Sequence, residues 1–550
     1  MKIYLLELSL VIRSLKNNFN LHQWLLFTLI ILILSLQIIG IVQGIFLNAT
    51  NVGILWASDL DAGKILFESL SINKVIKQNF ATGVQYGVLY PRLGNLLSFF
   101  IPGYSAPQNF NPIEIHEYSS HIALMLISFG SLLALSLLIS KILFRDILYV
   151  LGSTSVILSS FLGTKEWVNY IFRLHPDNLL SLLVALFIYF IFKFKINNDN
   201  ISFIVLCLIA SLALCTKQSF LLFLPLLLFI YVPPLTKTAL FKASNLYAHI
   251  AYFYFIIGFP QNFGVWWSFS FLLRQSEYSL PGNVHSFTRW IIQFTEQSAL
   301  PVLAIIILCI ISDRFNEKKS EKKSCRFLWL QLFLIWFLPY GYLLTKNIIS
   351  GHSHYNLPHV SSGLVLLSLI LINTKIQPIY NIRKWFQINQ VRPLVALCLL
   401  LLLVNLTVGI IPSTVSSTFQ EVISGRIELQ KTYSFISSLT TKSEKVITEV
   451  SIPVPYYRGI FHGPYGLSVT LEEFYKIDPD TVLINSAALP AIMDGEKLSS
   501  YFLTGRKNLQ EIRKYYGIFY KKVNEAIDPR MIRWKLDYED KNGIQVWKRI

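Results

Sequence analysis

Charged residues are scarce in this sequence: they make up 14% of the chain, whereas an average soluble domain has about 25%. The deficit is uneven, because long stretches have no charge and the charges gather in the segments between them. This pattern is typical of membrane spans and their connecting loops. It excludes a soluble globular protein and predicts an integral protein of the lipid bilayer.

Cysteine is also sparse, and no two cysteines form a Cys-x-x-Cys pair. The five residues lie in or beside apolar runs: Cys207, Cys215, Cys309, Cys325 and Cys398. We therefore expect neither a disulfide framework nor a structural zinc site, and we interpret the cysteines as small apolar packing residues. No repeat of about 20–50 residues is visible either, which excludes solenoid folds.

Acidic residues are fewer than basic residues, and the formal net charge is +17. Much of the Lys and Arg excess lies in short linkers between apolar runs, where the orientation rule for membrane proteins already explains it. We therefore expect the lipid bilayer as a partner and no nucleic acid.

Apolar runs near the length that crosses a bilayer number about eleven. They are 24–46, 119–140, 147–163, 178–192, 201–216, 219–235, 246–262, 298–312, 327–345, 358–374 and 393–412. The first run is too long for a signal peptide, follows about twenty residues of mixed character and precedes no Ala-x-Ala site. The sequence therefore predicts a polytopic α-helical membrane protein.

Orientation follows from the distribution of Lys and Arg. With the N-terminus in the cytoplasm, the short cytoplasmic segments hold 19 Lys and Arg residues and the short outer loops hold 6. We therefore predict a cytoplasmic segment 1–22, a transmembrane domain 23–412 with a long first outer loop 47–118, and an extracytoplasmic domain 413–550. The last domain is predicted to be a small α/β domain, with strand-like runs at 445–450, 481–484 and 543–547 and a helical stretch near 509–516.

The polar residues that need explaining lie in the outer loops. The first loop contains two carboxylates two residues apart, Asp59 and Asp61, and then the stretch from Tyr86 through Tyr90 to Arg92. The second loop holds five ionisable groups: Lys165, Glu166, Arg173, His175 and Asp177. Carboxylates, cations and aromatic residues thus gather on one side of the membrane.

Further cations follow in later outer loops. Lys217 lies in a tight turn between two apolar runs, Arg274 lies in the loop 262–297, and Lys346 precedes His354 and Tyr355. These cations and acids also have a simpler interpretation. Lys and Arg at the membrane interface often extend to lipid headgroups, and exposed acids are often only solvated. Taken together, they suit a lipid-linked phosphate substrate: cations hold the phosphate, and a carboxylate removes a proton from the acceptor.

The order of four short motifs resembles the C-type glycosyltransferase superfamily, GT-C, which includes protein O-mannosyltransferases and lipid A aminoarabinose transferases. The motifs are Ser58-Asp-Leu-Asp61, Tyr86-Gly-Val-Leu-Tyr-Pro91, Thr216-Lys-Gln218 and His354-Tyr-Asn-Leu-Pro358. The sequence departs from the family pattern where Leu60 separates two acids and where Gln218 replaces a common proline. In architecture the resemblance covers the whole chain.

The resemblance implies an inverting sugar transfer from a polyprenyl-phosphate donor to a glycan, lipid or protein acceptor. Asp59 would be the general base, with Asp61 as the alternative. The donor phosphate would be bound by Lys165, Arg173, Lys217, Lys346, Arg92 and Arg274, and the substrates oriented by Tyr355, His354, His175, Tyr86 and Tyr90. The resemblance implies no obligatory cofactor and leaves open a divalent metal, which would bind at Asp59 and Asp61 if one is used.

Other functions remain open. A transporter or flippase of polyprenyl-linked lipids would also have many spans and a basic cavity, and a non-catalytic membrane protein with the same fold would look almost the same. A polymer ligase would share the substrate class but depend on a large late outer loop, whereas the late loop 346–357 is short. The expected location is a bacterial inner membrane with the site on the periplasmic side, although an endoplasmic reticulum membrane has the same topology.

Overall fold

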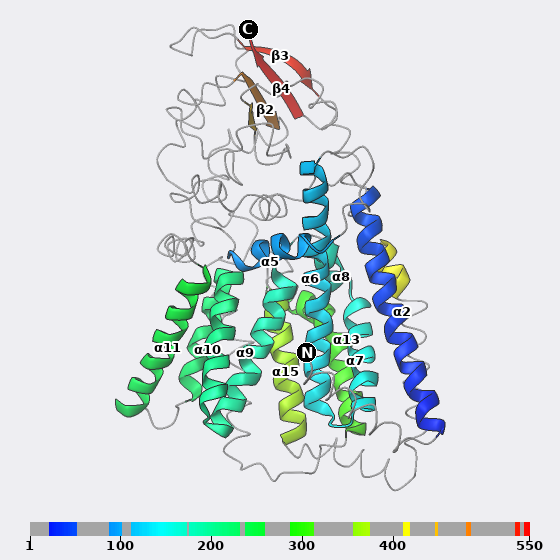
Figure 1. Ribbon diagram of the computed structural model, residues 1–550, viewed down its shortest axis with the longest axis vertical. Coiled ribbons are helices and arrows are strands. Elements are labelled where there is room, and N and C mark those ends of the chain that lie inside the picture. Colours follow the sequence, from blue (N-terminus) through cyan, green and yellow to red (C-terminus); the bar gives the residue numbers. More distant parts are fainter. Residues whose placement is uncertain are drawn as a thin grey trace.

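The computed structural model describes twelve parts of the chain, and they form a bundle of long helices with a small sheet beyond one end (Figure 1). The described residues are 21–51, 87–101, 112–172, 175–230, 237–258, 287–312, 356–373, 411–417, 446–448, 480–485, 534–539 and 544–550. The cytoplasmic segment 1–22 and the loop 47–118 thus lie largely outside them, and the predicted domain boundaries stay predictions.

The bundle consists of long helices, some of which follow one another through tight turns. They are α2 (Leu21–Asn51), α6 (Pro112–Leu143), α7 (Ile147–Leu162), α9 (Asp177–Asn197), α10 (Asn200–Thr216), α11 (Lys237–Gly258), α13 (Phe287–Ile311) and α15 (Leu357–Asn373). Two shorter helices are α5 (Leu89–Ser98) and α8 (Lys165–Phe172), and η2 (Gln218–Ile230) is a 3-10 helix. Figure 1 shows α5 lying across the end of the bundle.

By length and composition, four of the described helices are apolar enough to cross a membrane. Their apolar parts are Thr28–Phe46, Ser119–Leu143, Asp177–Asn197 and Ile292–Ile310. A fifth candidate is α7 with α8, which are bent by 85° at their junction, and α10 and α15 are shorter apolar helices. The protein is therefore an integral membrane protein, as predicted. The total of about eleven spans stays a prediction, because 327–345 and most of 393–412 lie outside the described residues.

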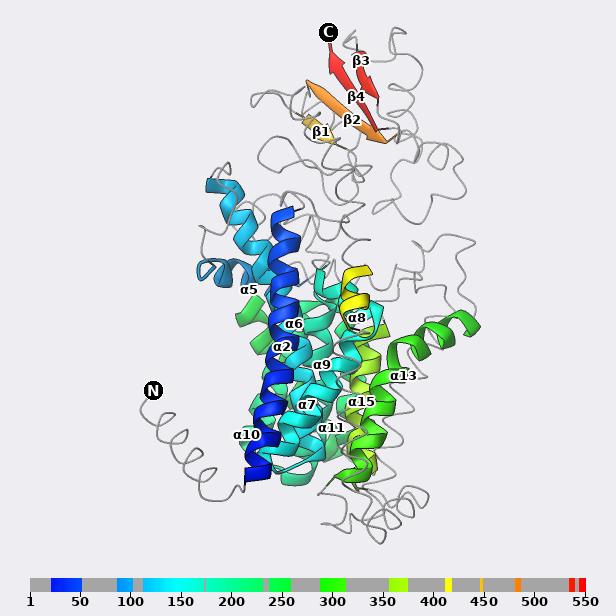
Figure 2. The ribbon, with the colours of Figure 1, turned by 90° about the vertical axis from the view of Figure 1, so that its right-hand side faces the viewer.

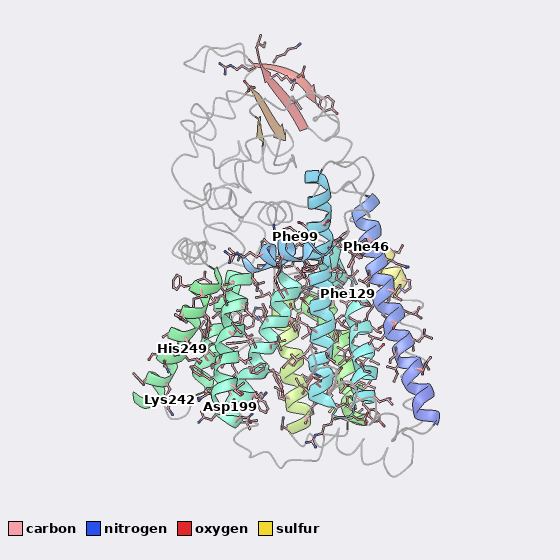
Figure 3. All side chains as sticks on the ribbon, viewed as in Figure 1. Phe46, Phe99, Phe129, Asp199, Lys242 and His249 are labelled. Atoms are coloured by element: carbon pink, nitrogen blue, oxygen red, sulfur yellow. The ribbon has the colours of Figure 1, made fainter. Side chains whose placement is uncertain are left out.

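The chain alternates between the two ends of the bundle (Figures 1 and 2). We call the end where α5 lies the outer end, because the sequence places the loop containing it outside, and the opposite end the inner end. The turns α7–α9 and α10–η2 lie at the outer end, and the turns α6–α7 and α9–α10 at the inner end. Asp199 and Lys242 mark the inner end and Phe99 the outer end in Figure 3.

Local side-chain chemistry produces the tight inner turns. Asp146 precedes α7, and its carboxylate accepts a hydrogen bond from the Leu148 backbone N–H at 2.8 Å. Asp199 precedes α10 in the same way, and its carboxylate accepts a hydrogen bond from the Ser202 N–H at 2.7 Å. This hydrogen bond lowers the pKa of Asp199. Asn198 ends α9 with φ 51°, a left-handed conformation that Asn tolerates well. These N-caps allow two long helices to be joined by very few residues.

The centre of the bundle is α9, which packs against α6, α10 and α15. Buried serines are frequent there, and several bond within their own helices: the hydroxyls of Ser136, Ser140 and Ser211 donate to carbonyls four residues earlier. Their small side chains let helices approach closely, and these bonds satisfy the hydroxyls without water. The described cysteines Cys207, Cys215 and Cys309 are buried. The thiols of Cys207 and Cys215 contact backbone carbonyl oxygens of α11 at 4.0 and 3.8 Å.

The predicted run 219–235 corresponds partly to η2, a 3-10 helix of 13 residues that contains Pro225. A 3-10 helix rises about 2.0 Å per residue against about 1.5 Å for an α-helix. Thirteen residues therefore extend about 26 Å, most of the roughly 30 Å of a hydrocarbon core. The tighter winding lets a short segment cover nearly the depth of the bilayer.

The sheet has the order β1-β2-β4-β3. Its strands are β1 (Val446–Thr448), β2 (Thr481–Asn485), β3 (Trp534–Glu539) and β4 (Ile544–Arg549). The pair β1–β2 is parallel, whereas β2–β4 and β3–β4 are antiparallel. Three of these strands overlap the strand-like runs of the sequence, and both views place the sheet beyond the outer end (Figures 1 and 2). The helical stretch near 509–516 lies outside the described residues, so an α/β domain stays a prediction.

Candidate functional site

A buried ion pair joins two of the predicted outer clusters. The Lys217 Nζ donates hydrogen bonds to both carboxylate oxygens of Asp177, at 2.9 and 3.1 Å. Lys217 is 5% exposed and Asp177 only 1%. Lys217 therefore does not extend to the lipid headgroups, and its charge is held inside the protein by a carboxylate from the neighbouring helix.

The positions of Asp177 and Lys217 follow from the packing of antiparallel neighbours. Asp177 is the first residue of α9, and Lys217 immediately follows α10, so the beginning of one helix lies beside the end of the other. The helix dipole favours an acid at a helix N-terminus and a cation at a C-terminus. The pair therefore complements the dipoles of both helices as well as each other.

His175 completes the cluster. Its Nδ1 contacts the Asp177 carboxylate, and its ring lies against Tyr170 with the ring centroids 5.6 Å apart. His175 is 3% exposed. Residues from the second outer loop and from the Thr-Lys-Gln turn thus form one buried group, and the carboxylate of Asp177 is its centre.

The Tyr-Gly-x-x-Tyr-Pro motif packs directly onto the Thr-Lys-Gln turn. The Gly87 N–H donates a hydrogen bond to the Thr216 carbonyl at 3.1 Å. A Cβ atom at Gly87 would lie 1.9 Å from the carbonyl oxygen of Cys215, so only glycine fits against this backbone. Two motifs that are far apart in the sequence therefore meet at the outer end.

Tyr90 anchors α5 on α6. Its hydroxyl donates to the Leu124 carbonyl at 3.0 Å and shares a 3.0 Å hydrogen bond with Ser128. Burial raises the pKa of Tyr90 above its usual range, and the nearby charge of Asp177 raises it further, while the bond to Ser128 opposes both. The neutral hydroxyl of Tyr90 is thus hydrogen-bonded to α6. Its predicted role in orienting a substrate stays a prediction.

Two more of the predicted phosphate-binding cations, Arg92 and Lys165, lie at the outer end, on α5 and α8. Arg92 is half-buried on α5, and its Nη1 donates to the Ile257 carbonyl near the end of α11 at 2.5 Å. Burial lowers the pKa of Arg92. Lys165 is exposed at the start of α8. Both share the outer end with Lys217, whose ammonium bonds to the carboxylate of Asp177.

The remaining predicted site residues lie outside the described residues. They are Asp59, Asp61, Tyr86, Arg173, Arg274, Lys346, His354 and Tyr355. Within the described parts of the chain, no group of three or more His, Cys, Asp or Glu residues is placed to hold a metal ion. The assignments of the general base and of a metal at Asp59 and Asp61 therefore stay predictions.

Sequence reasoning named Asp177 among the ionisable groups of the second outer loop but gave it no role, and it did not name Asn178. Asn178 is fully buried next to the ion pair, and neither atom of its side-chain amide makes a hydrogen bond within the structure described here; the same holds for the hydroxyl of Ser181 one turn later. An unsatisfied buried amide is unfavourable by about 1–3 kcal/mol. The sequence feature that could have identified both residues is the segment His175-Pro-Asp-Asn178 directly before an apolar run. Polar residues at the start of a membrane span need hydrogen-bonding or charged partners inside the protein.

The cluster is a buried polar group in which the charge of Lys217 is offset by that of Asp177. A cation, a carboxylate, an imidazole and unsatisfied polar atoms lie together among apolar helices. Such a group can bind an anion by sharing Lys217 and can supply hydrogen bonds from Asn178 and Ser181.

No protein-family model and no curated protein matches this sequence. Two solved structures are similar to it: crystal structures of ArnT from Cupriavidus metallidurans in the apo state and bound to undecaprenyl phosphate. Their sequence identities are 12% and 10%, each with a TM-score of 0.49, and each similarity covers 84% of this chain and 94% of that chain. These values assign no function to the chain.

Proposed function

We propose that this protein is a membrane glycosyltransferase that transfers a sugar from a polyprenyl-phosphate donor to an extracytoplasmic acceptor. The observation that carries the proposal is the meeting, at the outer end, of the Tyr-Gly-x-x-Tyr-Pro segment, the Thr-Lys-Gln turn and the second outer loop around Asp177. The first two of these segments are among the four motifs whose order resembles GT-C enzymes. Their contact supports a common site at that end of the bundle.

In this proposal the donor phosphate competes with Asp177 for Lys217. The ion pair holds the ammonium at a fixed position while no donor is bound, and the donor phosphate then accepts hydrogen bonds from it. Lys165, Arg173, Lys346, Arg92 and Arg274 would contribute further positive charge, and the apolar helices would contact the polyprenyl chain. Cations at this place also stabilise the charge on the departing phosphate.

The transfer itself would be a single displacement. Asp59, or Asp61 in its place, accepts the proton of the acceptor nucleophile, which attacks the anomeric carbon from the face opposite the phosphate. The bond between the anomeric carbon and the phosphate oxygen breaks, and the polyprenyl phosphate leaves with the bonding electrons. The configuration at the anomeric carbon is therefore inverted.

The test is transfer of radiolabelled sugar from polyprenyl-phosphate donors in reconstituted membranes. We expect Asp59→Asn or Asp61→Asn to lower the transfer rate by about 10²–10⁴-fold, the contribution typical of a general base, with donor binding unchanged. Repeating the assay with EDTA tests for a divalent metal. Wild-type rates in both variants would overturn the assignment of the base.

The alternative is a flippase or transporter of polyprenyl-linked lipids. The buried Asp177–Lys217 pair between bundle helices favours it specifically, because intramembrane charges often mark a substrate path. The same preparation separates the two functions. Donor that crosses the bilayer intact, with no sugar transferred to any acceptor, would support the transporter and reject the glycosyltransferase.

A further inference from the structure

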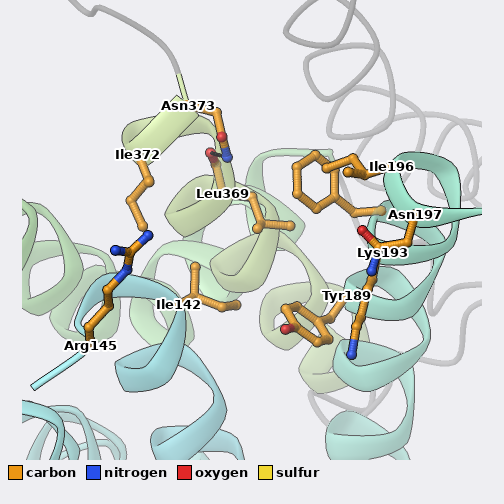
Figure 4. A pocket seen from close by; sticks show the side chains of 10 residues that line it. Ile142, Arg145, Tyr189, Lys193, Ile196, Asn197, Leu369, Ile372 and Asn373 are labelled. Atoms are coloured by element: carbon orange, nitrogen blue, oxygen red, sulfur yellow. Dashed lines mark hydrogen bonds between the residues drawn. The ribbon is translucent and has the colours of Figure 1, made fainter. Parts of the chain in front are cut away.

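A polar cavity lies at the inner end of the bundle, at the opposite end from the Asp177–Lys217 pair (Figure 4). Its volume is about 250 Å³, and it lies between the ends of α6, α9 and α15. Its polar lining consists of Arg145, Tyr189, Lys193, Asn197 and Asn373, and the rest of its wall is apolar. The cavity thus combines cations and amides with a hydrophobic surface.

The two cations lie on opposite sides of the cavity. Figure 4 shows Arg145 on one side and Lys193 on the other, with Ile142 and Leu369 between them. The Lys193 Nζ also lies 5.3 Å from the centre of the Phe190 ring, a cation–π contact that leaves the charge in place. The two positive groups therefore face a shared space.

The described residues that line the cavity include neither Asp nor Glu. Two described acids lie near the inner ends of these helices, and both carboxylates accept bonds from helix N-termini: Asp146 from the Leu148 N–H and Asp199 from the Ser202 N–H. Among the described lining residues the formal charges are therefore those of Arg145 and Lys193, and this wall suits an anion.

The depth of the cavity indicates which anion. Arg145 lies two residues beyond the apolar span Ser119–Leu143, and Lys193 lies in the last turns of α9. Residues at the ends of spans lie at the level of lipid headgroups. A basic pocket between helix ends on the cytoplasmic side is a common arrangement for binding anionic lipid headgroups.

We propose that this cavity binds the phosphate headgroup of an anionic phospholipid from the inner leaflet. Arg145 and Lys193 bind the phosphate oxygens, the amides of Asn197 and Asn373 donate to the headgroup, and an acyl chain lies along the apolar wall. The volume of about 250 Å³ is below the roughly 300–1,000 Å³ of drug-sized ligand sites, so the cavity fits a headgroup and not a whole lipid-linked sugar. The proposal is independent of the proposed function, because it concerns the opposite end of the bundle.

The test is native mass spectrometry of the full chain in neutral detergent with dioleoyl-phosphatidylglycerol or dioleoyl-phosphatidylcholine. These lipids share acyl chains and differ in headgroup charge. We expect the wild type to retain the anionic lipid preferentially. Each of Arg145→Gln and Lys193→Gln should weaken its binding about fivefold, and the double variant about thirtyfold, from a contribution of about 1 kcal/mol for each cation.

Two control variants and a competition with inorganic phosphate separate this proposal from others. Lys141→Gln removes an exposed cation in the last turn of α6 that does not line the cavity, and binding should be unchanged. The charge-preserving double variant Arg145→Lys and Lys193→Arg should retain the lipid, which excludes misfolding as the cause of loss. Equal retention of both lipids by the wild type, retention of phosphatidylglycerol by the Gln double variant, or its displacement by millimolar inorganic phosphate would each overturn the proposal.

Discussion

At the scale of single residues, the ion pair between Lys217 and Asp177 makes the sharpest stability prediction. Removing one partner leaves the other charge buried without compensation, which destabilises by about 3–5 kcal/mol. We therefore expect Asp177→Asn to lower the free energy of unfolding by roughly this amount, because Asp177 is only 1% exposed. The measurement is thermal unfolding of the purified protein in detergent, followed by intrinsic fluorescence.

The matched control removes both charges. Asp177→Asn combined with Lys217→Met should recover most of the lost stability, since no unpaired charge remains. If the double variant instead shows the sum of the two single losses, the pair contributes no coupling and the buried-charge argument fails.

The atoms around Gly87 and Gly94 differ, and this difference predicts unequal losses of stability when each glycine is replaced by alanine. At Gly87 an added Cβ would lie 1.9 Å from the Cys215 carbonyl oxygen and 2.8 Å from the Thr216 nitrogen, both backbone atoms. We expect Gly87→Ala to destabilise by about 1–3 kcal/mol or more, as overpacking does, and to separate α5 from the Thr-Lys-Gln turn. Thermal unfolding and the sugar-transfer assay both measure this effect.

Gly94 is the comparison for this prediction. A Cβ there would meet the Cδ2 of Leu124 at 2.5 Å, the far end of a side chain that can rotate away. Gly94→Ala should therefore be less damaging. Equal effects of the two substitutions would show that the backbone contact at Gly87 is unimportant.

At the scale of elements, a polar contact inside the bilayer holds α2 against α7. The Gln37 Nε2 donates to the Ser159 hydroxyl at 2.5 Å, and the Ser155 hydroxyl donates to the Gln37 Oε1 at 3.2 Å. Gln37 is 3% exposed, whereas Leu36 beside it is 54% exposed. The helix thus faces its neighbour with an amide and the outside with an apolar side chain.

We expect Gln37→Leu to weaken the packing of α2 by about 0.6–1.7 kcal/mol, the range measured for hydrogen bonds between membrane helices. Leu36→Ala is the control on the exposed face and should change stability by less than about 0.5 kcal/mol. Thermal unfolding of both variants in the same detergent makes the comparison. A larger loss for Leu36→Ala would mean that this face also packs against protein.

At the scale of the whole molecule, orientation can be tested through single cysteines. In a background with the five native cysteines replaced by alanine, we expect the Lys535→Cys variant to react with a membrane-impermeant maleimide in intact cells. Lys535 is exposed in β3, beyond the outer end. Asn200→Cys, at the exposed start of α10 at the inner end, should react only after the membrane is permeabilised.

Labelling of both sites in intact cells would contradict a single fixed orientation. Labelling of the Asn200→Cys variant alone would reverse the predicted orientation and place the Asp177–Lys217 cluster on the cytoplasmic side. The donor would then have to be presented from the cytoplasm, and the extracytoplasmic acceptor would be excluded.

The sequence by itself determined that the chain is a bundle of membrane helices, because an apolar run in lipid must satisfy its backbone hydrogen bonds internally. It also predicted strands within 481–484 and 543–547, which β2 and β4 confirm, and it named Lys217 and His175 as functional candidates. These are local properties, and the run lengths, turn residues and alternation that encode them are visible in the chain.

Only the tertiary structure decided which polar groups meet. Lys217 pairs with Asp177 because α9 and α10 pack side by side, and Tyr90 bonds to α6 because α5 lies across the outer end. The cavity between Arg145 and Lys193 likewise exists only where α6, α9 and α15 end together. In an apolar bundle many helix arrangements bury similar surface, so the partner of each polar group depends on packing, which no single segment of the sequence encodes.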